Sequence, residues 1–256
     1  MKNTIKEIAE ALRSMEDDKD PRIHVWEQDD RKGVNRLIKS FRTRLERVQK
    51  EHERFIDMTA FEMSARENGY KLIAGIDEVG RGPLAGPVVA AAVVLPDAFY
   101  LPGLDDSKKL SNTKKLELYE TIQQRALGIG VGFASAKEID DVNIYQATKL
   151  AMLRALGEMK VSPDMLLIDA MTLDIGIEQQ SIIKGDARSV SIAAASVIAK
   201  VTRDRFMTEL AKQYPYYRFE QNVGYGTKEH LEGLKQHGPI KEHRFSFEPI
   251  KSFKNE

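Results

Sequence analysis

The first 70 residues place apolar side chains at helical spacing in a strongly polar background. Leu37, Phe41, Leu45 and Val48 recur every three or four positions among charged residues. This is the pattern of an amphipathic helix, in which one stripe of side chains is buried and the rest meet water. We therefore expect residues 1–70 to form an N-terminal helical extension.

The pattern changes at Lys71 from helical spacing to short apolar runs. Residues 71–77 form one such run and end in an acid, and residues 87–95 form a second that is rich in valine and alanine. Runs of this length and composition are typical of strands, and the two are expected to pair. Further along, the pattern predicts a helix over 112–125 opened by an Asn or Thr cap, a strand over 129–136, a helix over 144–159, strands over 165–169 and 181–184, and helices over 191–214 and 228–236.

Three hairpin-linked strands followed by alternating helices and strands predict an α/β fold. Such an order gives a mixed sheet flanked by helices, here over residues 71–256 with a C-terminal helical region. Ligands of open α/β sheets bind beyond the carboxyl ends of the strands. Asp77 and Asp169 are both expected at such ends.

The amino-acid composition limits the classes of protein to which this chain can belong. The 256 residues are 42% hydrophobic and 30% charged, as in an ordinary globular protein with a substantial core. There is no cysteine, so a metal ion must be held by oxygen or imidazole ligands. The beginning of the chain has no apolar block long enough for a secretory signal or a membrane span. We expect a cytoplasmic monomer that does not bind membranes.

The formal net charge of zero conceals one basic cluster. A single acid, Glu46, lies within residues 31–50, beside these bases: Arg31, Lys32, Arg36, Lys39, Arg42, Arg44, Arg47 and Lys50. A solvated helix face and a phosphate-binding surface explain this cluster equally well, and binding to phosphate would weaken with salt. Trp26 is interpreted as a packing anchor of the extension rather than a base-stacking residue.

The segment from Gly75 to Pro87 contains the most informative chemistry. Asp77 and Glu78 are adjacent acids at a strand end, and a glycine-rich loop follows them. Glycines allow main-chain groups to approach a ligand closely, so Gly80-Arg81-Gly82 is suited either to reading a sugar hydroxyl or to cradling a phosphate. The Arg81 side chain has two interpretations, a phosphate contact or a salt bridge to Glu78.

Two further acids are expected at the ends of strands. Asp169 closes an apolar strand, and Asp186 lies in a turn before a long helix, where an Asx turn is the ordinary interpretation. Together with Asp77 and Glu78 they make a set of oxygen ligands suited to Mg²⁺ or Mn²⁺. Two such ions about 4 Å apart can generate hydroxide and stabilise a leaving oxygen in phosphoryl chemistry.

Several long motifs, in order and spacing, resemble those of bacterial ribonuclease HII. The resemblance covers about residues 71–244, and its motifs are Asp77 to Pro87, Asp106-Ser107-Lys108-Lys109-Leu110, Leu166 to Ala170, Ala194 to Asp204, and Gly224-Tyr225-Gly226-Thr227. It implies a ribonuclease H-like sheet. The arginine between Gly80 and Gly82 is of the HII rather than the HIII type.

The resemblance also implies the function and the catalytic acids. Asp77, Glu78, Asp169 and Asp186 would hold two Mn²⁺ or Mg²⁺ ions, with Asp77 touching both. The enzyme would hydrolyse the RNA strand of RNA–DNA hybrids and nick DNA duplexes on the 5′ side of embedded ribonucleotides, leaving 3′-hydroxyl and 5′-phosphate ends. Replication and repair proteins are candidate partners.

Substrate contacts follow from the same motifs. The main chain of Gly80, Arg81 and Gly82 would contact the ribonucleotide 2′-hydroxyl, which distinguishes RNA from DNA. Tyr225 would pack on the sugar of the following deoxynucleotide. Ser107, Lys108 and Lys109 are expected to contact phosphate. Outside this set, Asp204 is expected to pair with Lys200 one helical turn away, and His230 and His243 are expected at the surface.

Two other functions compete with the nuclease. The first is an actin-like sugar kinase that uses residues 77–82 as its phosphate loop, but the C-terminal half has no second adenosine-binding glycine motif. The other is a non-catalytic duplex-binding protein that uses residues 31–50. Incubation with a duplex containing one ribonucleotide, with and without Mg²⁺ or Mn²⁺, separates all three.

Overall fold

The chain folds into two compact units. The computed structural model describes residues 3–105, 107 and 110–255. Contacts divide it into Met1–Ile56 and Asp57–Glu256, with the division inside the last turns of a long helix. The boundary expected at residue 70 stays a prediction.

The first unit is helical, as the spacing of its apolar residues indicated. It contains α1 (Ile5–Ser14), α2 (Pro21–Glu27) and most of α3 (Lys32–Met58). Its helices bury a small core made of Ile8, Leu12, Ile23, Trp26, Val34, Ile38 and Phe41. Trp26 is only 4% exposed within this core, which confirms its role as a packing anchor.

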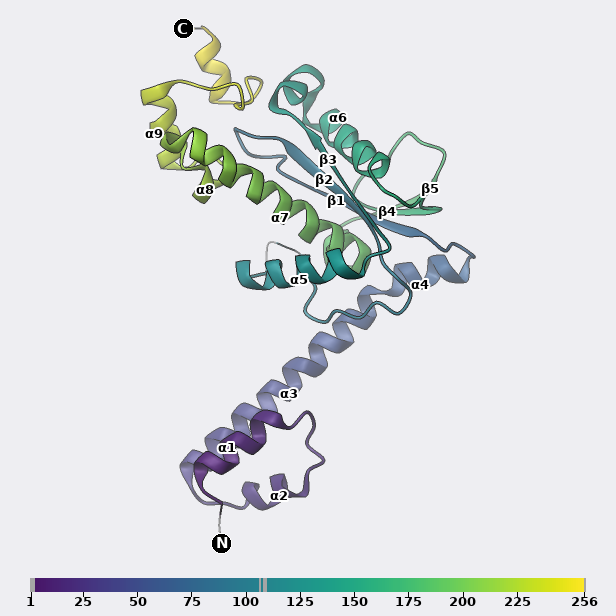
Figure 1. Cartoon of the computed structure of the whole chain (residues 1–256), viewed down its shortest axis with the longest axis vertical. Coiled ribbons are helices and arrows are strands. Elements are labelled where there is room, and N and C mark those ends of the chain that lie inside the picture. Colours follow the sequence, from purple (N-terminus) through teal and green to yellow (C-terminus); the bar gives the residue numbers. More distant parts are fainter. Residues whose placement is uncertain (1–2, 106, 108–109, 256) are drawn as a thin grey trace. The chain divides into compact units, whose positions relative to one another are not determined.

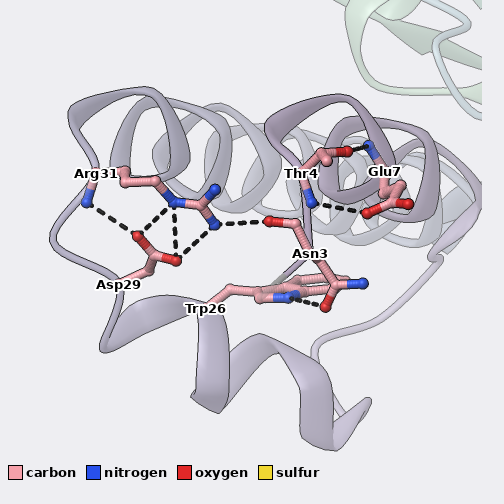
Figure 2. Close-up of polar contacts among 6 residues, drawn as sticks. All are labelled: Asn3, Thr4, Glu7, Trp26, Asp29 and Arg31. Carbon is pink, nitrogen blue, oxygen red and sulfur yellow. Dashed lines mark hydrogen bonds and ion pairs between the residues drawn. The ribbon is translucent and has the colours of Figure 1, made fainter. Parts of the chain in front are cut away.

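Polar caps fix the ends of the helices in this unit (Figure 2). At the start of α1, the Thr4 hydroxyl accepts from the Glu7 amide and the Glu7 carboxylate accepts from the Thr4 amide, which is a capping box. Before α3, the Asp29 carboxylate accepts from both the main chain and the guanidinium of Arg31. Arg31 also donates to the carbonyl of Asn3 at 2.8 Å, which ties the chain start to the loop before α3.

The second unit is built on a mixed sheet of five strands (Figure 1). The strands are β1 (Ile73–Val79), β2 (Val88–Val94), β3 (Gly128–Ala134), β4 (Met165–Asp169) and β5 (Glu178–Ile182), in the spatial order β3-β2-β1-β4-β5. The first three strands pair antiparallel, and β4 and β5 continue the sheet in parallel from β1. This confirms the expected mixed sheet.

Helices cover both faces of the sheet. Those of the second unit are α4 (Ala60–Glu67), α5 (Asn112–Arg125), α6 (Ala136–Gly157), α7 (Val190–Gln213), α8 (Phe219–Asn222) and α9 (Lys228–His237), with short 3₁₀ turns at Gly185–Ala187 (η1), Pro215–Tyr217 (η2) and Ile250–Asn255 (η3). Helices α6 and α7 lie on opposite faces (Figure 1). α7 approaches β1 so closely that a Cβ on Gly75 would lie 2.0 Å from the main chain of Ser191. None of the described helices has the length and hydropathy needed to cross a membrane.

Some element bounds differ from those expected. Helix α6 consists of two helical segments that meet at a kink at Asn143, where φ is 69°. The second segment begins next to residue 144, as expected, and the first, opened at Ala136 by a capping box of Ser135 and Glu138, was not expected. The cap of α5 is Ser111 rather than an Asn or Thr. Strand β5 occupies Glu178–Ile182, earlier than expected, because its polar residues pair in parallel with β4 despite their weak apolar pattern.

Candidate active site

Asp77 and Asp169 lie side by side on neighbouring parallel strands. Ile76 pairs with Ile168 in the register of β1 and β4, so each acid follows the last registered pair. Side chains alternate between the two faces of a sheet. Ala74 and Ile76 face the core under α6, so Asp77 points to the α7 face. Asp169 reaches the same face because it follows Ile168, which also packs in the α6 core.

The environment of Asp77 opposes its negative charge. Burial is the main cause that raises the pKa of Asp77 well above its usual value, and the nearby carboxylates of Glu78 and Asp169 add to the increase. Hydrogen bonds from the Ser196 side chain and the Glu78 amide act in the opposite direction. Like charges gathered in a poorly solvated place favour either a proton or a cation. Asp77 is only 5% exposed.

Asp186 comes close to this pair through its main chain. It lies in η1 immediately after Gly185, whose amide donates to Oδ1 of Asp169 at 2.8 Å. The Asp186 side chain is buried, with 7% exposure. The structure therefore joins the turn that carries Asp186 to Asp169, although the two are 17 residues apart in the sequence.

Glu78 follows Asp77 in β1, and its charge is one of the causes that raise the pKa of Asp77. Its Oε1 forms a 3.3 Å ion pair with the Arg81 guanidinium, which matches the salt-bridge interpretation of that arginine. Among the described residues, no group of three or more His, Cys, Asp or Glu side chains is placed to hold a metal ion. The structure thus brings Asp77 and Asp169 together, whereas the complete four-acid set stays a prediction.

The glycine-rich loop after β1 lies against Tyr225. A Cβ on Gly82 would be 3.5 Å from Cε1 of Tyr225 and would meet no closer atom outside its immediate neighbours. Tyr225 itself is 49% exposed. A main-chain hydrogen bond also joins the loop to the segment that carries Tyr225, because the Leu84 amide donates to the carbonyl of Gly224 at 2.8 Å. The expected sugar-reading loop and the expected sugar-stacking tyrosine are therefore neighbours.

The remaining expected site residues have different surroundings. Ser107 is buried, and its hydroxyl lies 2.9 Å from that of Ser196, the same serine that hydrogen-bonds Asp77. Lys108 and Lys109 lie outside the described residues. Asp204 pairs with Lys200 at 2.8 Å, as expected. The phosphate contacts proposed for Ser107, Lys108 and Lys109 stay predictions.

The surface position expected for His230 and His243 is wrong. Both are fully buried, and their Nε2 atoms lie 3.0 Å apart. The burial of these histidines was hard to predict from the sequence, since a histidine in a polar segment has the same local pattern as a surface residue. Two buried arginines, Arg203 and Arg244, were missed for the same reason.

Some side chains of the basic cluster of residues 31–50 contact other groups of the first unit, and some line a surface hollow. Several bases are used within the first unit: Arg31 pairs with Asp29, Arg42 with Glu27, Arg47 with Glu51, and Arg44 donates to the carbonyls of Leu12, Arg13 and Met15. A surface hollow of about 570 Å³ on α3 is lined by Arg36, Lys39, Ser40, Thr43, Arg44 and Arg47. Its lining contains no acid, and beside the engaged Arg44 and Arg47 it holds two further cations, Arg36 and Lys39, so the hollow is suited to an anion.

Comparison with known proteins decides the family. A model described as "Ribonuclease HII" matches residues 74–250, and one described as "Ribonuclease HII N-terminal domain" matches residues 4–66. The chain belongs to the ribonuclease HII family. Ribonucleases HII of Bacillus cereus strain B4264 and Bacillus anthracis strain A0248 are 57% and 55% identical to it, over 97% and 98% of this chain and 96% and 97% of theirs. The chain is therefore an enzyme, a nuclease of the hydrolase class.

Solved structures show the same fold. The ribonuclease H2 of Pyrococcus horikoshii is 25% identical, with a TM-score of 0.61, over 72% of this chain and 98% of that one. An Archaeoglobus fulgidus RNase HII, solved in a complex with PCNA, is 25% identical with a TM-score of 0.59, over 70% of this chain and 96% of that one. Bst-RNase HIII, solved with Mn²⁺, has a TM-score of 0.55 over 75% of this chain and 72% of its own at 18% identity, which shows the fold alone.

Proposed function

We propose that this ribonuclease HII hydrolyses the RNA strand of RNA–DNA hybrids and nicks DNA duplexes on the 5′ side of embedded ribonucleotides, leaving 3′-hydroxyl and 5′-phosphate ends. One observation carries the proposal. Asp77, which is buried, and Asp169, which is partly buried, lie at the strand edge from which the Gly80–Gly82 loop begins. A phosphate-cleaving centre and a reader of the adjacent sugar can then act on one nucleotide.

The acids fit divalent cations. Asp77, Glu78, Asp169 and Asp186 supply only carboxylate oxygens, the donors that Mg²⁺ and Mn²⁺ prefer. Burial, which is the main cause of the raised pKa of Asp77, and the nearby Glu78 and Asp169 carboxylates disfavour its negative charge, and a bound cation would stabilise that charge. Two bound ions would supply activation of water and stabilisation of the leaving oxygen. The proposal depends on the Asp77–Asp169 pair, because in the described residues the four carboxylates do not form one group.

The loop and Tyr225 supply selectivity for RNA. The amides of Arg81 and Gly82 would donate to the 2′-hydroxyl oxygen, a group that DNA lacks. Tyr225 is half exposed beside Gly82, so its ring is available to pack on the next deoxyribose. This arrangement favours RNA-to-DNA junctions and single ribonucleotides.

The decisive assay uses a DNA duplex with one ribonucleotide. We expect a single nick on its 5′ side in Mn²⁺ or Mg²⁺ and none in a chelator. Asp77→Asn and Asp169→Asn should each abolish the nick, whereas Asp141→Asn, which removes an exposed acid paired with Lys137 on α6, should not. Normal cleavage by both site variants would refute the assignment.

The competing functions are less well supported. Membership of a nuclease family excludes the sugar kinase. The basic hollow on α3 favours a role in duplex binding that accompanies cleavage rather than replacing it. Arg36→Gln with Lys39→Gln should reduce the dependence of duplex affinity on salt by about one to two ions. Lys50→Gln, an exposed change on the same helix outside the hollow, is the matched control.

A further inference from the structure

Two arginines are fully buried in the second unit, and their guanidinium groups bind main-chain carbonyls instead of carboxylates of the described residues. Arg203 lies on α7, Arg244 lies in the C-terminal segment after α9, and both are 0% exposed. Neither forms an ion pair with a carboxylate of a described residue. Burial lowers the pKa of Arg203 to about 10 and that of Arg244 to about 9, so both are charged at neutral pH. Buried unpaired charges are costly, and their hydrogen bonds must compensate for lost hydration.

Both guanidinium groups bind main-chain carbonyls of the loop between β1 and β2. Arg244 donates to the carbonyl of Gly80, to that of Arg81 at 2.8 Å, and to that of Gly86 at 2.9 and 3.0 Å. Arg203 donates to the carbonyls of Ala85 at 3.1 Å and Pro87 at 2.9 Å. Five of the eight residues from Gly80 to Pro87 therefore give a carbonyl to one of the two arginines.

The direction of these carbonyls determines where the loop amides point. In a trans peptide the C=O group and the following N–H group point in opposite directions, and the only cis peptide in the described chain is Glu248–Pro249. Since the carbonyls of Gly80 and Arg81 point to Arg244, the amides of Arg81 and Gly82 point away from it. Neither amide donates to another described residue.

The same arginines connect the loop to the segment that carries Tyr225. The third donor of Arg203 binds the carbonyl of Val223 at 2.9 Å. Gly224 packs so tightly that a Cβ there would lie 2.4 Å from the carbonyl oxygen of Ala85. The amide of Arg244 donates to the carbonyl of Leu84 at 2.9 Å, which completes the connection. The contact between Gly82 and Tyr225 is thus supported by Arg203, Arg244 and the main chain of the two segments.

We propose that Arg203 and Arg244 are positioning residues for ribonucleotide recognition, which hold the Gly80–Pro87 loop so that the amides of Arg81 and Gly82 face the sugar. The inference rests on the proposed reading of the sugar by this loop. A planar guanidinium has five donors in a fixed fork and can hold several carbonyls at once, whereas an ammonium group on a flexible stem cannot reproduce that geometry. Charge alone is therefore insufficient at either position.

Arg244→Lys and Arg203→Lys test the proposal because each keeps the positive charge but replaces the planar guanidinium, with its five donors, by a single ammonium group. Affinities are measured for a duplex with one ribonucleotide and for the same duplex made of DNA throughout. We expect the preference for the ribonucleotide to fall about 10- to 100-fold, since small misplacements of a positioning group have effects of that size. Affinity for the all-DNA duplex and for Mn²⁺ should be unchanged. Arg154→Lys, whose guanidinium binds the Phe133 carbonyl and Glu138 on α6, is the control and should keep the preference.

The outcomes separate this inference from the proposed function. A wild-type protein without preference for the ribonucleotide would refute the reading of the sugar by the loop. A wild-type preference that both lysine variants retain would refute the role of the arginines. Equal losses of affinity for both duplexes would also refute it, because they would indicate a general structural role.

A second measurement needs no arginine variant and applies even if those variants fail to fold. Amide hydrogen exchange in the Asp77→Asn protein, which leaves the substrate intact, should show rapid exchange at Arg81 and Gly82. It should show slower exchange at Leu84 and Gly86, whose amides are bonded within the fold. The ribonucleotide duplex should protect Arg81 and Gly82, whereas the all-DNA duplex should not. Slow exchange of these two amides in the free protein would overturn the proposal.

Discussion

At the scale of single residues, the loop after β1 depends on glycines for two different reasons. Gly80 has a φ of 92°, and a Cβ there would lie 2.2 Å from Nε of Arg203, so both conformation and space exclude a larger residue. Gly82 has neither restriction. Apart from its chain neighbours, the one described group within 4 Å of an added Cβ is the Tyr225 ring, on the side where we propose that the sugar binds. One glycine thus serves the fold, and the other leaves room for a ligand.

Alanine at these two glycines should therefore have contrasting effects. Gly80→Ala should lower the free energy of unfolding by about 2 kcal/mol or more, because it combines a left-handed backbone with a clash against a buried side chain. Gly82→Ala should leave that free energy within about 0.5 kcal/mol and still lower cleavage at a single ribonucleotide. Chemical denaturation and the nicking assay measure the two quantities. Equal stability of the two variants would contradict this account of the loop.

At the scale of elements, α4 is joined to the start of α7 by one buried carboxylate. Oε1 of Glu62 accepts hydrogen bonds from the Ser189 hydroxyl at 2.6 Å, the Ser191 amide at 3.0 Å and the Ser191 hydroxyl at 2.6 Å. A negative charge at the N-terminus of a helix is also favoured by the helix dipole. Because η1 and Asp186 come directly before α7, this contact supports the turn that carries Asp186, one of the proposed metal ligands.

Removal of this carboxylate should weaken both stability and the site. Glu62→Ala leaves the Ser189 and Ser191 donors buried without their acceptor, which should cost about 2 kcal/mol of unfolding free energy. Affinity for Mn²⁺, measured by calorimetry, should fall in the same variant. Glu67→Ala on the exposed face of α4 is the control, with little change expected in either measurement. If the two variants behave alike, Glu62 does not support the site.

At the scale of the whole molecule, the units defined by contacts place α4 with the sheet. Ala65 packs in the same buried cluster as Ile73, Met165, Leu167, Ile182 and Ile192. A helix that appears in sequence to close the extension is therefore part of the core of the second unit. The last helix before β1 cannot be removed without exposing that cluster.

Two truncations should behave differently for this reason. A chain of residues 57–256 keeps α4 and should nick a single-ribonucleotide duplex, with weaker duplex affinity at low salt if α3 contacts phosphate. A chain of residues 71–256 lacks both Glu62 and Ala65 and should unfold at a lower temperature. Thermal unfolding followed by circular dichroism compares the two. Equal midpoints would show that α4 contributes little to the second unit.

The buried histidine pair should make the fold sensitive to acid. Burial, together with the neighbouring His230, lowers the pKa of His243 to about 4, and burial lowers the pKa of His230 as well. Below the ordinary histidine pKa of about 6.5, the unfolded chain binds protons that the folded chain resists. The stability due to a neutral His243 is therefore complete above that pH and is lost as the pH falls towards 4, by about 3 kcal/mol.

Denaturation across this pH range measures the effect. We expect the unfolding free energy of His243→Gln to depend less on pH between about 6.5 and 4 than that of the wild type. His237→Gln, at an exposed position on α9, should follow the wild-type curve. Parallel curves for all three proteins would exclude the buried pair as the source of acid sensitivity.

Much of this protein follows from the sequence alone, and the rest depends on packing between distant segments. Local periodicity predicted the helical extension, the three paired strands and the bounds of β4, because spacing of apolar residues depends on neighbours in the chain. It also placed Asp77 and Asp169 near strand ends, where parallel pairing makes them neighbours. The weakly apolar β5 and the place of α4 in the second core depend on long-range partners, so periodicity could not reveal them. The first segment of α6 begins at a local capping box of Ser135 and Glu138, a signal that apolar spacing does not contain. The buried state of Arg203, Arg244 and the histidine pair was decided only by tertiary structure, since a polar side chain is buried only where distant carbonyls or rings come together to satisfy it.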